Sequence, residues 1–161
     1  MPVPQYIEGE TRPRKVAIAT AKLVDKGDLV GMNAGTLVRA EDETWTTDLA
    51  TTQSNFRARF AGVAAQSKLS TTNPRVFGNS QDNVIMVNTS GVFEFDCASA
   101  TFEVGDFVGP AKDTGNALLS DRVVAVGAEA NAIGRVAERG TAITRVKVET
   151  LSVLAPAARQ S

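Results

Sequence analysis

A short glycine-containing pattern that occurs twice constrains the fold of this 161-residue chain more than any other feature. In residues 101–136 the dipeptide Gly105-Asp106 begins an apolar, strand-like run, and Gly134 lies near the end of the segment. Gly27-Asp28 and Gly62 occupy matching places nearer the N-terminus. The Gly-Asp pairs are 78 positions apart and the later glycines are 72 apart, so the sequence predicts a degenerate duplication of one β-unit.

The residues of this pattern are typical of turns. Glycine adopts a positive φ at little cost, and an aspartate side chain can accept a hydrogen bond from a backbone N–H two residues further on. These properties explain the repeated Gly-Asp pairs without any catalytic role. The predicted turn residues are Gly27, Asp28, Gly35, Gly91, Gly105, Asp106 and Gly115.

Residues 16–38 have the pattern of two or three short strands. Val16, Ile18 and Thr20 alternate with alanines, as in a strand with two different faces. Asn33–Gly35 separates two further apolar runs, and asparagine and glycine both tolerate positive φ. The sequence therefore predicts a tight hairpin turn at this point.

A second hairpin is predicted in residues 84–97, where the runs 84–87 and 92–97 flank the turn-like sequence 88–91. The second run alternates between apolar and acidic side chains, which is typical of a sheet with one wet face. We expect a core role for Phe93, Phe95 and Cys97 and a solvated face for Glu94 and Asp96. Residues 145–149 alternate in the same way and predict a terminal strand.

One short helix is expected within residues 46–57, because four apolar side chains fall on one helical stripe. These side chains are Trp45, Leu49, Phe56 and Phe60. Thr46 or Thr47 is the predicted N-cap, with Asp48 in the first turn, where an acidic side chain favours the helix dipole. The polar segment 67–83 is predicted to be a long connection.

Short strands separated by turns, with a single helix, indicate an all-β fold. We expect a small β-barrel or β-tulip-like domain, with a jelly roll as the alternative. Residues 1–15 contain three prolines and a small basic cluster, and they predict an extended N-terminal arm. The predicted organisation is this arm, one β-rich domain over residues 16–151, and a C-terminal tail over residues 152–161.

The composition excludes several classes of function. A net charge of −1 gives no basic face for nucleic acid, and no apolar run is long enough to predict a membrane-spanning helix. The first residues lack the pattern of a signal peptide, and the single cysteine, Cys97, cannot form an internal disulfide. We therefore expect a protein assembled in a reducing cytoplasm, with no direct contact to nucleic acid or membrane.

No catalytic residue, cofactor site or metal site is predicted. The chain contains no histidine, the usual general base near neutral pH, so Cys97 has no histidine partner. The acidic run 41–43 has the pattern of a solvated turn, and the pair Glu94 and Asp96 lacks the flanking aromatic platforms of a sugar site. Neither a P-loop nor a dinucleotide fingerprint is present. The sequence thus predicts a protein that is not an enzyme.

Several of these segments together resemble the head-decoration or capsid cement proteins of tailed bacteriophages. The similarity is carried by the segments VGDFVG, AIGRVA, NTSGVFEFDC, KGDLVGMNAGTLV and FRARFAGVAAQS, within residues 16–151. The resemblance implies a β-rich structural virion protein on the outer surface of the capsid, which bridges subunits of the major capsid protein. It also implies a homo-oligomer, with a trimer favoured and a dimer possible.

The N-terminal segment supplies the expected capsid contacts, since an aromatic anchor beside basic groups suits a shell surface. The predicted contact residues are Tyr6, Ile7, Arg12, Arg14 and Lys15. Two alternatives from other classes remain. One is a small β-module of a tail or fibre that binds carbohydrate or a host surface. The other is an oligomeric β-barrel enzyme, such as a nucleotide hydrolase with sites at subunit interfaces.

Overall fold

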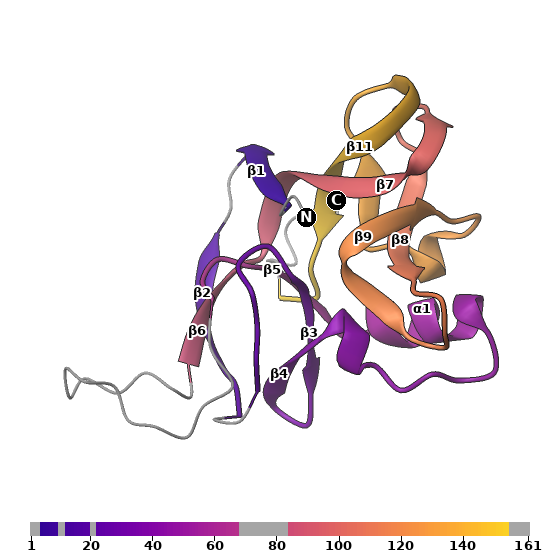
Figure 1. Cartoon of the computed structure of the whole chain (residues 1–161). Coiled ribbons are helices and arrows are strands. Elements are labelled where there is room, and N and C mark those ends of the chain that lie inside the picture. The colour runs from indigo at the N-terminus through magenta and orange to yellow at the C-terminus, as the bar shows by residue number, and fades with distance from the viewer. Residues whose placement is uncertain (1–3, 10–11, 20–21, 68–83, 155–161) are drawn as a thin grey trace.

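The computed structural model describes residues 4–9, 12–19, 22–67 and 84–154, and it confirms the predicted all-β class (Figure 1). Five strands close into a barrel in the order β7-β11-β10-β8-β9, because β9 also pairs with β7. A sixth strand, β1, pairs with the outer edge of β7. The bounds of these strands are β1 (Gln5–Glu8), β7 (Ser90–Phe102), β8 (Phe107–Lys112), β9 (Leu118–Ala125), β10 (Gly134–Val136) and β11 (Gly140–Leu151).

A second sheet has the strand order β2-β6-β5-β3-β4. Its strands are β2 (Pro13–Ala17), β3 (Leu29–Asn33), β4 (Thr36–Arg39), β5 (Phe60–Ala64) and β6 (Val84–Asn88). A parallel bridge between Ile18 and Leu37 brings the two ends of this sheet together. The parallel pairing of Asp96 with Arg122 closes the barrel in the same manner.

The two sheets are copies of one unit, which confirms the duplication predicted from the sequence. Taken in chain order, β2 to β6 have the same neighbours as β7 to β11. The register agrees as well, because Val30 on β3 lies opposite Gly62 and Val108 on β8 lies opposite Gly134. We call β2 to β6 the first unit and β7 to β11 the second unit.

The apolar cores of the two units meet. The core of the first unit contains small aliphatic side chains such as Val30, Ala61 and Val87. The larger cluster fills the second unit, but it also includes Phe56 and Phe60 from the first. The units therefore pack against each other through shared aromatic side chains.

The predicted helix is confirmed as α1 (Leu49–Arg57), which lies beside β8 of the second unit (Figure 1). The predicted cap is wrong. Asp48 is the N-cap, and its carboxylate accepts a hydrogen bond from the backbone N–H of Thr51 at 2.8 Å. Phe60 belongs to β5 rather than to the helix. The described part of the chain also contains two short 3₁₀ helices, η1 (Ala40–Asp42), which directly follows β4, and η2 (Glu129–Asn131), which lies between β9 and β10.

The hairpin expected between 84–87 and 92–97 is wrong, because β6 and β7 belong to different sheets. The chain passes from one unit into the other through Thr89, whose buried hydroxyl donates to the carbonyl of Arg12 at 2.8 Å. Gly91 is correspondingly not a turn residue; it lies within β7, opposite Thr150. Alternating side chains predict a strand, but they do not identify its partner.

The N-terminal segment is extended, but it is paired within the chain rather than forming a separate arm. β1 pairs with β7 of the second unit, and β2, which begins at Pro13, pairs with β6 of the first. At the other end, the hydroxyl of Ser152 donates to the carbonyl of Ala61, and Leu154 packs on the first core. The expected boundary at residue 16 thus falls within β2, and the expected boundary at residue 151 falls at the end of β11. Most of the predicted connection 67–83 and the end of the predicted tail lie outside the described residues.

Candidate functional site

The predicted contact residues lie on and between the first two strands. Tyr6 and Ile7 are on β1, Arg14 and Lys15 are on β2, and Arg12 lies just before β2. β1 and β2 follow each other along one side of the molecule (Figure 1). The structure thus arranges these residues along a continuous strand-rich segment, although the two strands belong to different sheets.

Tyr6 is the exposed aromatic of this segment, with 50% of its surface accessible. Its ring packs edge-on against Phe93 at a centroid distance of 5.8 Å, and its hydroxyl donates to the carbonyl of Gly9 at 2.6 Å. These contacts fix the ring while leaving one side accessible. A held aromatic side chain loses little further conformational entropy when it meets a partner.

The basic side chains of β2 are exposed. Arg14 donates to the carbonyl of Leu154 at 3.5 Å, which is a long hydrogen bond at the surface. Lys15 lies next to it in the strand, so the two cations extend toward opposite faces of the sheet. This part of the first unit therefore presents positive charge on both faces of one strand.

The two Gly-Asp turns are structurally equivalent. Gly27 and Gly105 have φ values of 95° and 92°. The carboxylates of Asp28 and Asp106 each accept a backbone N–H at 2.9 Å. The donor lies three residues before each aspartate, not two residues after it as the sequence suggested. Both turns hold the start of a strand, β3 or β8, and take no part in a ligand site.

Two further predicted turn residues, Gly35 and Gly115, lie in two different turns. Gly35 has a φ of 85° in the two-residue turn between β3 and β4, which confirms the predicted hairpin. Gly115 lies between β8 and β9, where its N–H donates to the carboxylate of Asp113 at 2.7 Å.

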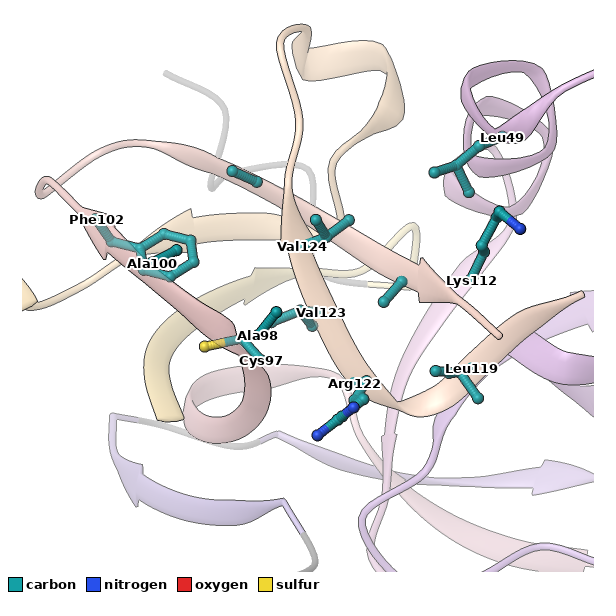
Figure 2. Close-up of a pocket in the computed structure, with 12 residues that line it drawn as sticks. Leu49, Cys97, Ala98, Ala100, Phe102, Lys112, Leu119, Arg122, Val123 and Val124 are labelled. Atoms are coloured by element: carbon teal, nitrogen blue, oxygen red, sulfur yellow. The ribbon is translucent and has the colours of Figure 1, made fainter. Parts of the chain in front are cut away.

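An apolar groove of about 370 Å³ opens between β7 and β9 (Figure 2). It exists because these strands pair only at Asp96 and Arg122 and diverge beyond that point. Leu49 of α1 contributes to its wall. The other apolar lining residues include Ala98, Ala100, Phe102, Leu119, Val123 and Val124. The sequence did not predict this groove, because its lining residues come from four separate segments, α1, β7, β8 and β9.

The polar groups of the groove do not form a catalytic arrangement. Lys112 donates to the carbonyl of Gly115 at 3.0 Å and lies 5.9 Å from the centre of the Trp45 ring. The buried Nε of Arg122 has no hydrogen-bond partner among the described residues. Burial, with a smaller contribution from nearby Asp96, raises the pKa of the Cys97 thiol, so it is a poor nucleophile. The groove is therefore a small apolar surface with two cations beside it.

The acidic residues are paired rather than assembled into a site. Glu43, expected in a solvated turn, is buried against Arg59, with Arg59 Nε 3.3 Å from its carboxylate. Arg145 contacts both Glu94 and Asp96, at 3.1 and 3.2 Å. Asp96 is only 7% exposed, so the expected solvated face is covered at this position.

Asp28 differs from these carboxylates because it lies among other acids. Burial raises its pKa to about 6, and nearby Asp25 and Glu41 act in the same direction, while the hydrogen bond from the Asp25 N–H lowers it. The group therefore titrates in a mildly acidic range. Its effect is on stability.

The described part of the chain contains no cluster of three or more His, Cys, Asp or Glu side chains that could hold a metal ion. None of its helices is long and apolar enough to cross a membrane. No protein-family model, curated protein or solved structure matches this chain. The fold and the sites therefore define it as a duplicated β-barrel protein with exposed strand segments.

Proposed function

We propose that this chain is a structural virion protein that binds the outside of a tailed-phage capsid and bridges its major capsid subunits. The observation that carries the proposal is the exposed segment formed by β1 and β2, which bears the half-exposed ring of Tyr6 and the exposed cations Arg14 and Lys15. The resemblance of its β-units to decoration proteins supplies the class of partner.

The physical mechanism is distributed contact. Each copy gains modest free energy at each capsid subunit, and engagement of one contact raises the effective concentration at the next. A duplicated scaffold suits this role. The two units share one topology and pack against each other, so the exposed segments of one unit lie at a fixed distance from those of the other. No bond is made or broken, and the protein acts by resisting separation of the subunits that it joins.

Co-sedimentation tests the proposal directly. The full chain is mixed with expanded capsids assembled from the major capsid protein encoded in the same genome, and bound protein is measured against added protein. We expect saturable binding with a fixed number of copies per capsid and a higher temperature of capsid disruption. Absence of binding to expanded capsids would refute the proposal.

A pair of matched variants tests the segment itself. Arg14→Ala with Lys15→Ala should weaken capsid binding about tenfold or more, since two charged contacts are lost. The control, Arg135→Ala with Arg139→Ala, removes two exposed cations from the second unit. Equal weakening by both pairs would show that net charge, and not this segment, determines binding.

A further inference from the structure

The duplication allows the surroundings of equivalent strands to be compared. β2 in the first unit corresponds to β7 in the second, since each pairs with the last strand of its unit. The core residues Val16 and Ile18 take the places of Phe95 and Cys97. One edge of β7 pairs with β11. Along its other edge, Val92–Glu94 pair with β1 and Asp96 pairs with β9.

The same edge of β2 is only half occupied. Ile18 bridges to Leu37 of β4, as Asp96 pairs with β9 in the second unit. Residues 13–15 correspond to the part of β7 that is covered by β1, and no strand among the described residues pairs with them on that side. Within the described ranges, the first unit therefore has an open strand edge where the second unit has a filled one.

β1 of one molecule cannot pair with the edge of β7 and with the edge of β2 at the same time. There is one such strand per molecule, and it lies on β7, with Tyr6 opposite Phe93. Exchange of β1 between copies would leave the number of strands and the number of edges unchanged. The described part of the chain therefore offers no second strand for the edge of β2.

The side chains on this edge indicate which strand would bind. Pro13, Arg14 and Lys15 are all exposed, and proline is typical of an edge strand. In the register of β1 on β7, two successive residues of an added strand would lie opposite Arg14 and Lys15. Opposite charges across a strand pair stabilise it, whereas like charges destabilise it.

We infer that the open edge of β2 is a docking site for an extended, acidic segment of a partner protein, which adds to the first sheet antiparallel to β2. Backbone hydrogen bonds along residues 13–15 supply affinity, and Arg14 and Lys15 select acidic side chains. The inference concerns this edge alone and does not require that the partner be a capsid protein.

The test fuses an acidic strand to the full-length protein, with no partner protein present. The segment Thr-Val-Glu-Glu-Val-Thr is joined ahead of Met1 by a flexible Gly-Ser linker of about fifteen residues, which spans roughly 20 Å. Tethering raises the effective concentration to the millimolar range, so weak pairing is detected. The readout is NMR-detected hydrogen exchange of the β2 amides that point away from β6. We expect these amides to exchange at least about tenfold more slowly than in the untethered protein.

The control is the same fusion with Thr-Val-Lys-Lys-Val-Thr, which we expect to give no protection. Arg14→Glu with Lys15→Glu should reverse the preference, and unchanged amide exchange in β3 and β4 would show that the first unit remains folded. Equal exchange rates with the acidic and basic strands would overturn the inference. This assay contains no capsid, so its outcome is independent of the co-sedimentation result.

Discussion

The backbone N–H of Gly105 donates a hydrogen bond to the carbonyl of Val136 at 2.9 Å. The first unit repeats this contact between Gly27 and Ala64 at 2.8 Å. In both units the return bond is also present, since the N–H of Val136 or Ala64 donates to the carbonyl of the aspartate in the Gly-Asp turn. The duplication is thus preserved in individual hydrogen bonds, although few side chains are the same.

Gly134→Ala should lower the free energy of unfolding by about 1–3 kcal/mol. A Cβ at this position would overlap the carbonyl oxygen of Glu149 and lie 2.8 Å from Cγ1 of Val148. Chemical denaturation measures the change. Gly127→Ala is the control, because nothing lies within 4 Å of its added Cβ, and we expect a change within about 0.5 kcal/mol. Equal effects at the two positions would contradict the close approach at Gly134.

The pair Glu43 and Arg59 should show a coupling energy of about 1–2 kcal/mol in a double-mutant cycle with Glu43→Gln and Arg59→Met. The Glu43 side chain is 2% exposed and that of Arg59 is 36% exposed, so solvent screens the pair only in part. The surface pair Glu103 and Arg139, at 56% and 59% exposure, is the control, with an expected coupling below about 1 kcal/mol. A Glu43–Arg59 coupling no larger than this control would show that burial does not strengthen the pair.

Asp28→Asn should remove a pH dependence of stability between about pH 4 and pH 6. The carboxyl has a pKa of about 6 in the folded chain against 3.8 as its ordinary value. Within this window the folded state holds the proton more tightly, so the free energy of unfolding falls as the pH rises. One proton gives a slope of at most about 1.4 kcal/mol per pH unit.

The measurement for Asp28 is the free energy of unfolding of the parent and of the variant across pH 3–8. The asparagine amide oxygen can still accept the Asp25 N–H, so the turn is retained. Subtraction of the two curves cancels the other carboxyl groups. Parallel curves would mean that Asp28 is not buried as the structure shows.

Ala34→Asn should raise the free energy of unfolding by about 0.5–1 kcal/mol. Ala34 has a φ of 52° in the two-residue turn before Gly35, and asparagine tolerates this conformation better than alanine does. Ala128→Asn is the control, because Ala128 has a φ of −136°. Thermal unfolding of both variants checks the prediction, and a gain at Ala128 alone would refute it.

Local patterns predicted much of the fold. The repeated Gly-Asp turns, the hairpin at Gly35, the helix within 46–57 and the buried positions Phe93 and Phe95 all follow from short-range spacing. These features depend on backbone conformations and side-chain periods that neighbouring residues determine.

The pairing of distant segments could not be predicted in the same way. The alternation in 92–97 is the same whether β7 pairs with β6 or with β11, so the expected hairpin was wrong. β1 and the start of β2 were missed as paired strands because they are short and flanked by prolines. The groove between β7 and β9 was missed because it depends on where two strands diverge.

The sequence by itself determined the two copies of the unit, their turns and the alternation of their strands, because glycine, aspartate and apolar spacing act within a few residues. Only the tertiary structure decided that β7 and β9 close a barrel and that Phe56 and Phe60 join the two cores. It also decided that β1 covers one strand edge, while no strand among the described residues covers the equivalent edge of β2. Those outcomes depend on hydrogen bonds and apolar burial between residues far apart in the chain, which local patterns do not specify.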